Sequence, residues 1–255
     1  MIQIHHLNCV EIQSAQHGRA IGHCLLLATP EKLMLIDTGV GLLDTQKPNE
    51  RIGSQLIDLV GFRFNEQYTA FRQIEALGLN PEKVTDCIIS HLDNDHIGGL
   101  ADFPKANVHL SSEEYESFKS GNPRYLSTPL AHKPTIVTYP KSAETWFGFE
   151  ARKLNIDLAT NLYLIPLFGH TLGHCGVAFQ HQNHWWLYVG DAYYLKAELA
   201  DEQHPVDELA AIRADDNAQR ITTLGKLRRF SKEHPEVKMF GYHDPAEFPD
   251  LTISG

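Results

Sequence analysis

The stretch HLDNDHIGG (residues 91–99) places two histidines and two aspartates within six positions and then two glycines. Acidic side chains this close repel one another unless a cation lies among them. Imidazole and carboxylate groups are the ligands that proteins offer to zinc, iron and manganese. In an extended chain residues 91, 93 and 95 can point to one side, and His96 turns inward as the next helix begins. Gly98 and Gly99 let the loop pack closely. The stretch therefore predicts a metal-binding loop rather than a polar surface turn.

Apolar strand patterns elsewhere in the chain also end near a histidine or an aspartate. In sheets flanked by helices, ligands gather at strand ends, where several loops converge. Four strand ends are therefore expected to meet at one site: 84–90 before His91, 162–167 before His170, 185–189 before Asp191, and 237–240 before His243.

The remaining patterns alternate strands with helices, which predicts an α/β fold with mixed sheets. Residues 25–37 are typical of a β-hairpin that turns around Pro30. Apolar residues spaced three or four apart predict helices over 64–77 and 221–230.

The middle of the chain, around 111–150, contains proline, glycine and serine and is expected to be an irregular loop. Long loops in compact domains often close over a substrate. No repeat or low-complexity linker divides the sequence, so residues 1–255 are expected to form a single domain.

Composition excludes several classes of protein. The 255 residues carry a formal charge of −10, which argues against general nucleic-acid binding. The sequence contains neither a signal-peptide pattern nor an apolar run of membrane-spanning length, so a cytoplasmic protein without membrane contact is expected. The four cysteines are far apart, which argues against a disulfide framework or a structural zinc site. Cys24 and Cys87 lie in apolar runs and are expected to be buried thiols.

The order of these motifs resembles that of the metallo-β-lactamase fold superfamily. HxDxDH at 91–96 is followed by GHT, GD and a late histidine, and the superfamily's usual first motif is HxHxDH. LIDTG (35–39) is similar to the superfamily's early turn with an aspartate. The resemblance covers nearly the whole chain. It implies an α/β fold, a four-layer αβ/βα sandwich of two mixed β-sheets.

The resemblance also implies a site for two divalent metal ions. It assigns His91, residue 93 and His170 to the first metal, Asp95, His96 and His243 to the second, and Asp191 to a bridging position. His174 matches a position outside the ligand set and is expected to be packed or hydrogen-bonded. Asp37 is expected to orient a ligand histidine.

Asp93 stands where most of the family has histidine, and a carboxylate there resembles the flavo-diiron branch. Two divalent cations carry +4 and three aspartates −3, so a bridging hydroxide brings the sum to zero, where the histidine version would reach +1. A lower charge predicts a less acidic bridging water. An added hard oxygen ligand favours iron or manganese over zinc.

Within the superfamily the sequence is most similar to the lactonases that hydrolyse N-acyl homoserine lactones. GDAYY places Tyr194 three residues after Asp191, as a lactonase tyrosine is placed. The resemblance implies that a bridging hydroxide attacks an ester or lactone carbonyl while Tyr194 donates a hydrogen bond. Asp95 or Asp191 would then move the proton to the leaving alkoxide. A packed, non-catalytic Tyr194 remains the alternative.

Three other activities stay open, and the substrate is expected to be a small molecule in each enzymatic case. The first is a thioester hydrolase of the glyoxalase II type, although that family carries a helical carboxyl-terminal domain and this sequence ends twelve residues after His243. The second is a flavo-diiron-like oxidoreductase, which would need a separate electron donor. The third is a non-enzymatic metal-binding protein. Because the family often dimerises, a homodimer is expected.

Overall fold

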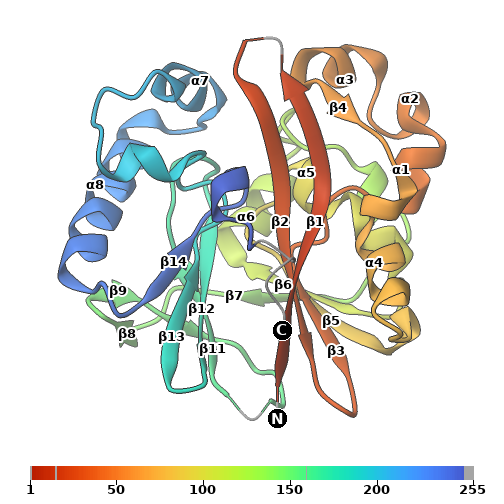
Figure 1. The fold of residues 1–255 in the computed structure, drawn as a ribbon, viewed down its shortest axis with the longest axis horizontal. Helices are drawn as coiled ribbons and strands as arrows, with labels where there is room; N and C mark the ends of the chain where they lie inside the picture. The colour runs from red at the N-terminus through yellow and green to blue at the C-terminus, as the bar shows by residue number, and fades with distance from the viewer. Residues whose placement is uncertain (1, 15, 159, 250–255) are drawn as a thin grey trace.

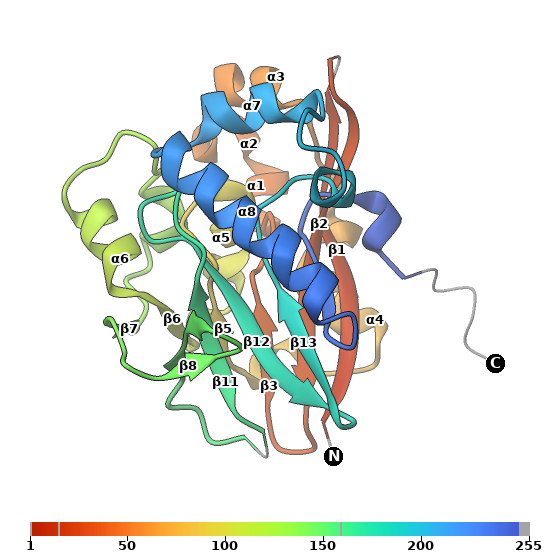
Figure 2. The ribbon, with the colours of Figure 1, turned by 90° about the vertical axis from the view of Figure 1, so that its left-hand side faces the viewer.

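Two β-sheets and the helices on their outer faces form a layered α/β structure in the computed structural model, which describes residues 2–14, 16–158 and 160–249. Helices α1 to α4 lie on one side and α7 and α8 on the other, with both sheets between them (Figure 1). After a quarter turn, α8 is seen to cross β12 and β13 (Figure 2). This arrangement confirms the predicted sandwich of mixed sheets.

The first sheet has seven strands and is mixed, with an antiparallel part and a parallel part. Neighbouring strands pair antiparallel in the run β4-β1-β2-β3 and parallel in the run β3-β5-β6-β7. In sheet order the strands are β4 (Phe62–Arg63), β1 (Gln3–Ser14), β2 (Gly18–Ala28), β3 (Leu33–Ile36), β5 (Val84–Ile88), β6 (Asn107–Ser111) and β7 (Ile136–Tyr139).

The second sheet has five strands, and a short hairpin lies beside it. β13 and β14 pair parallel and the other neighbours antiparallel. In sheet order the strands are β10 (Arg152–Lys153), β11 (Leu162–Pro166), β12 (Cys175–His181), β13 (His184–Tyr188) and β14 (Lys238–Phe240), and the hairpin consists of β8 (Thr145–Trp146) and β9 (Phe149–Glu150).

The helices connect the strands and are mostly short. The α-helices are α1 (Leu42–Gln46), α2 (Pro48–Arg51), α3 (Ser54–Val60), α4 (Ala70–Ala76), α5 (Asn94–Ile97), α6 (Ser112–Lys119), α7 (Val206–Arg213) and α8 (Asn217–Glu233). The 3-10 turns are η1 (Glu66–Tyr68), η2 (Pro81–Lys83), η3 (Gly98–Asp102), η4 (Thr128–Leu130), η5 (Lys196–Leu199) and η6 (Pro245–Glu247). Among the described residues, no helix combines the length and the apolar character needed to cross a bilayer.

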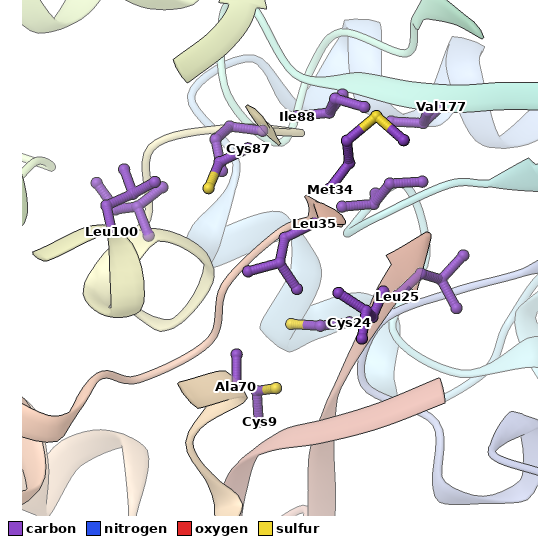
Figure 3. Packing of buried hydrophobic residues seen from close by; sticks show 14 of the residues in the cluster. Cys9, Cys24, Leu25, Met34, Leu35, Ala70, Cys87, Ile88, Leu100 and Val177 are labelled. Atoms are coloured by element: carbon purple, nitrogen blue, oxygen red, sulfur yellow. The ribbon is translucent and has the colours of Figure 1, made fainter. Parts of the chain in front are cut away.

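The core fills both the space between the sheets and the space under the helices. Met34 and Ile88 of the first sheet lie next to Val177 of β12, whereas Leu35 and Cys87 point the other way, toward the helix side (Figure 3). Strands buried on both faces explain the continuous apolar runs of the sequence.

The cysteine and hairpin predictions are confirmed. All four cysteines are buried free thiols, including Cys24 and Cys87. β2 and β3 form the predicted hairpin, whose turn is closed by a hydrogen bond from the Thr29 amide to the Lys32 carbonyl, 3.0 Å long.

Two expectations about the helices and the central loop need correction. The helix expected from residue 64 begins only at Ala70, because Thr69 caps it and accepts the Arg72 amide. Residues 111–150, expected to be an irregular loop, contain α6 and β7. Ser111 caps α6, whose polar sequence SEEYESFK hides its helical period. Residues 120–135 are irregular apart from η4.

Candidate metal centre

Four strand ends converge as expected, because the carboxyl ends of strands from both sheets point to the same edge. β5 leads into the loop that carries His91, and β11 and β13 lead to His170 and Asp191. β14 precedes His243. Their side chains form two adjacent clusters of possible metal ligands, and Asp191 contacts residues of both.

The first cluster consists of His91, His170 and Asp191, all buried, whose ligand atoms lie within 4.8 Å of one another. Asp191 Oδ2 is 3.4 Å from His170 Nε2 and 3.9 Å from His91 Nε2. Ligands of one tetrahedral cation at about 2.1 Å from it lie roughly 3.4 Å apart, so these separations suit a common ion.

The second cluster consists of Asp95, His96 and His243, again with ligand atoms within 4.8 Å. His243 Nε2 is 3.6 Å from Asp95 Oδ2 and 3.3 Å from Asp191 Oδ2. Asp191 Oδ1 is 3.3 Å from His96 Nε2. Asp191 thus contacts residues of both clusters, as a bridging ligand would.

The donor atoms of these clusters fit two divalent cations. His91 Nε2, His96 Nε2 and Asp191 Oδ1 are buried and have no hydrogen-bond partner in the described part of the chain. Leaving such atoms unpaired is costly, and a cation removes that cost. Burial alone would raise the pKa of Asp191, but His243 and His96 hold it well below its usual range.

Asp37 orients His96 of the second cluster, which agrees with the expectation that it orients a histidine of the site. Asp37 Oδ2 accepts a hydrogen bond from His96 Nδ1 at 2.8 Å. The same carboxylate accepts the Ser90 amide, the Ser90 hydroxyl and the Tyr188 hydroxyl. Ser90 in turn lies 3.0 Å from His91 Nδ1. One buried carboxylate therefore fixes a ring directly and a second ring through Ser90.

His174 has the hydrogen-bonded position that was expected outside the ligand set. Its Nδ1 donates to the Leu167 carbonyl at 3.0 Å, and its Nε2 accepts the Asp191 amide at 3.0 Å. Burial lowers the pKa of His174 to about 3, so its ring is neutral. The ring holds the backbone of Asp191.

Asp93 lies at the edge of the first cluster, but its carboxylate has another partner. Asp93 Oδ2 is 3.5 Å from His91 Nε2 and 3.2 Å from His170 Nε2. Arg124 binds both carboxylate oxygens, with Nε 2.6 Å from Oδ1 and Nη2 2.5 Å from Oδ2. Arg213 Nη2 lies 3.7 Å from Oδ2. Burial opposes ionisation, but Arg124 keeps the pKa of Asp93 well below its usual range.

The Asp93–Arg124 pair corrects the charge count made from the sequence. A carboxylate in place of histidine lowers the charge of the centre, but the guanidinium returns that unit of charge within hydrogen-bond distance. Arg124 could not be recognised from the sequence, because it lies in the irregular stretch after α6 and no spacing links it to the ligand motifs.

Glu114 is a second residue that the sequence analysis missed. Its buried carboxylate accepts the Leu92 amide at 2.8 Å and the Gly173 amide at 3.1 Å. It also accepts the hydroxyls of Thr171 and Tyr125. Burial raises the pKa of Glu114 to about 7, although these donors oppose the rise. Glu114 therefore connects the loop that carries His91 with the loop that carries His170.

Tyr194 lies across both clusters. The centroid of its ring is 5.8 Å from that of His170 and 5.4 Å from that of His243. Burial and the nearby Asp191 raise the pKa of Tyr194 well above its usual value, so the phenol is protonated at neutral pH.

Comparison with known proteins assigns the family. The profile of the metallo-beta-lactamase superfamily matches residues 17–233. The chain belongs to the metallo-beta-lactamase superfamily. The resemblance inferred from the motif order is therefore confirmed.

The relatives found by sequence carry names of metal-dependent hydrolases. A protein of Mycobacterium tuberculosis named "Probable metallo-hydrolase" is 36% identical over 259 residues, which cover 96% of this chain and 81% of that protein. The N-acyl homoserine lactonase AiiB of Agrobacterium fabrum is 26% identical over 192 residues, or 71% of this chain and 64% of the lactonase. These relatives place the chain among the metallo-hydrolases of the superfamily.

Solved structures of lactonases share the fold. An N-acyl homoserine lactone hydrolase with N-hexanoyl-L-homoserine at its catalytic metal centre has a TM-score of 0.72 and 18% identity, covering 96% of this chain and 94% of that one. AidC, described as a dizinc quorum-quenching lactonase, has a TM-score of 0.60 and 21% identity, covering 89% and 74%. At these identities the likeness concerns the fold alone.

Proposed function

We propose that this chain is a hydrolase that uses two divalent cations, zinc, iron or manganese, to open an ester or lactone bond in a small molecule. The observation that carries the proposal is that Asp191 contacts both clusters and lies within 3.4 Å of His170 and 3.3 Å of both His96 and His243. The ligands would be His91, His170 and Asp93 on one side and Asp95, His96 and His243 on the other, with Asp191 between them.

Two cations held there would make water nucleophilic at neutral pH and polarise the oxygen of the substrate carbonyl. The protein's own residues would orient the substrate. Tyr194 is protonated and lies between His170 and His243, so its hydroxyl can donate a hydrogen bond to a carbonyl bound over the two clusters.

Proton transfer to the leaving alkoxide requires a carboxylate near the substrate. Asp95 and Asp191 are the two candidates, and their surroundings differ. The Asp191 side chain is 4% exposed and lies close to four histidines, whereas that of Asp95 is 17% exposed and lies close to His243. We therefore assign the proton transfer to Asp95 and the bridging position to Asp191.

The lactone or ester substrate is supported by the N-acyl homoserine lactonase among the relatives, with 26% identity over 71% of this chain. The four free thiols are consistent with a reducing cytoplasm, and the charge of −10 disfavours nucleic acid as a substrate. The proposal includes a homodimer, as is common in the family.

A substrate panel tests this function. The metal-stripped protein is reloaded with zinc, manganese or iron(II), its metal content is measured, and lactones, aryl esters, thioesters and phosphodiesters are offered. We expect two metal ions per chain and turnover of lactones or esters above all others. Preferred thioester turnover would instead indicate a glyoxalase II-type enzyme, and metal-dependent oxygen uptake a flavo-diiron-like one. Metal binding without turnover of any of these substrates would indicate a non-enzymatic metal-binding protein.

A further inference from the structure

Arg124 makes hydrogen bonds with every nitrogen of its guanidinium group. Nε donates to Asp93 Oδ1, and Nη2 donates to Asp93 Oδ2. Nη2 also donates to His170 Nε2 at 2.9 Å. Nη1 donates to the carbonyl of Arg213, the last residue of α7, and to Asp215 Oδ1, two residues beyond it. The Arg124 side chain is only 10% exposed, so its charge-assisted contacts are largely shielded from solvent, except for the one to the exposed Asp215.

Two of these contacts involve atoms that face the first cluster. His170 Nε2 is the ring atom that lies 3.4 Å from Asp191 Oδ2, and Asp93 Oδ2 is 3.5 Å from His91 Nε2. An imidazole nitrogen has one lone pair, which can accept one hydrogen bond or bind one metal ion. A cation in the first cluster would therefore need the lone pair to which Arg124 Nη2 donates.

The other contacts of Arg124 leave the first cluster free. Nε binds the other carboxylate oxygen of Asp93, and Nη1 is anchored to the C-terminal end of α7 and to Asp215 just beyond it. The guanidinium can give up its contact with His170 and remain attached at both other points. Withdrawal thus costs the hydrogen bond from Nη2 to His170 and weakens the one from Nη2 to Asp93 Oδ2, while the rest of the side chain stays bound.

The second cluster has no comparable partner. Across the described ranges, the ion pairs of Asp95 and Asp191 are with histidines, and none is with lysine or arginine. His96 and His243 are held at Nδ1 by Asp37 and by the Ile21 carbonyl, so their Nε2 atoms remain directed at the cluster.

We propose that Arg124 and the first metal ion compete for His170 and Asp93, so that the two positions of the centre load unequally. The second cluster fills at low metal concentration, and the first fills only as Arg124 withdraws from His170. Arg124 is a positioning residue that sets metal occupancy. This inference rests on the proposed two-cation centre, but it does not depend on which substrate is cleaved.

Cobalt(II) binding to the metal-stripped full chain tests the competition. Co²⁺ is added in steps in the presence of a chelator of known affinity, and visible absorption reports each ion bound. The wild type should show two unequal affinities. In Arg124→Met the weaker affinity should tighten by about tenfold, the equivalent of one lost charge-assisted hydrogen bond, while the stronger affinity should stay unchanged.

Two further variants separate the contact from its charge. Arg213→Met removes a positive charge 3.7 Å from Asp93 that does not contact His170, and it should leave both affinities within about twofold of the wild type. Arg124→Lys keeps the charge but lacks the planar fork, and it should give an intermediate affinity. Circular dichroism establishes that each variant is folded.

Equal affinities in the wild type, or an unchanged or weakened first position in Arg124→Met, would overturn the competition. An equal gain in Arg213→Met would reduce it to a general charge effect and would overturn it too. If Arg124→Met does not fold, the wild-type isotherm and Arg124→Lys decide the matter. A wild type that binds no metal contradicts the proposed function itself. A wild type that binds two ions with equal affinity contradicts only this inference.

Discussion

The two clusters of the proposed metal centre offer the same types of ligand but are supported by different partners. In the second cluster, His96 and His243 are held by a carboxylate and a backbone carbonyl, and the ring of Tyr242 packs 3.8 Å from that of His96. In the first cluster, His170 is contacted by the guanidinium of Arg124. Side chains of the same types therefore have different charged neighbours in the two clusters.

Asp191 is the residue that both clusters share, so replacing it should affect them equally. In Asp191→Asn the shape is kept but the negative charge near His96, His170 and His243 is lost. Even an indirect partner of a metal ligand is worth about 10- to 100-fold in affinity or activity. We expect a loss of more than about a hundredfold in turnover and weaker binding of both ions, measured by kinetics and by metal analysis.

Asp201→Asn, on the surface, is the matched control and should retain both ions and full turnover. If Asp191→Asn lost only one ion and bound the other normally, the two clusters would not share this carboxylate.

The convergence of the proposed ligands could be predicted from the sequence because short motifs place them at strand ends. The 91–96 loop and the residues after β11, β13 and β14 come together in the structure as expected. Asp37 was expected from the resemblance of LIDTG (35–39) to the superfamily's early turn, and it directly follows β3. Local spacing suffices for such residues, since strand order carries each to the same edge.

Arg124 and Glu114 could not be predicted, because their partners are distant in the sequence. Arg124 reaches residues 31 and 46 positions away, and Glu114 reaches Thr171 across 57. Both lie in or near a segment whose polar composition resembled a loop. The helix that carries Glu114 buries little apolar surface, so hydrophobic periodicity gave no signal for it.

Glu114 lies nearer to the first cluster, because its hydrogen bonds reach Leu92, next to His91, and Thr171, next to His170. Its folded pKa is about 7, above its ordinary 4.5. The raised value means that the folded state binds the extra proton. This stabilisation is complete below about pH 4.5 and is lost as pH rises through about 7. At about 1.4 kcal/mol per unit of pKa, the free energy of unfolding should fall by roughly 3 kcal/mol over that range relative to Glu114→Gln.

Chemical unfolding at several pH values with chelator present measures this difference. Glu116→Gln on the same helix removes a carboxylate that is 69% exposed and should track the wild type at every pH. A constant difference between wild type and Glu114→Gln would mean that the hydrogen-bond donors offset burial and leave the pKa of Glu114 at its ordinary value.

Asp37 provides the opposite test, because its direct histidine contact is to the second cluster. Asp37→Asn removes the negative charge and one of the two acceptor oxygens that hold Ser90 and His96, and it should weaken the second metal position by about 10- to 100-fold. The first position should change less, since Asp37 reaches His91 only through Ser90. Chelator competition with Co²⁺ measures both affinities.

Asp86→Asn is the matched control for this variant, because Asp86 holds His109 at 2.9 Å in a buried pair away from the centre. It should leave both metal affinities unchanged. A larger loss at the first position than at the second in Asp37→Asn would reverse the comparison between the clusters.

Tyr194 lies beside both clusters, and replacing it should change the metal affinity of neither. Tyr194→Phe keeps the ring beside His170 and His243 but removes the hydroxyl, so both metal affinities should be retained. Loss of one hydrogen bond to the reacting carbonyl should lower kcat by about tenfold. Tyr193→Phe is the control, because the Tyr193 hydroxyl donates to Glu247 rather than facing the centre, and its kcat should be unchanged. Wild-type kcat in Tyr194→Phe would assign the ring a packing role, with substrate orientation left to the two cations.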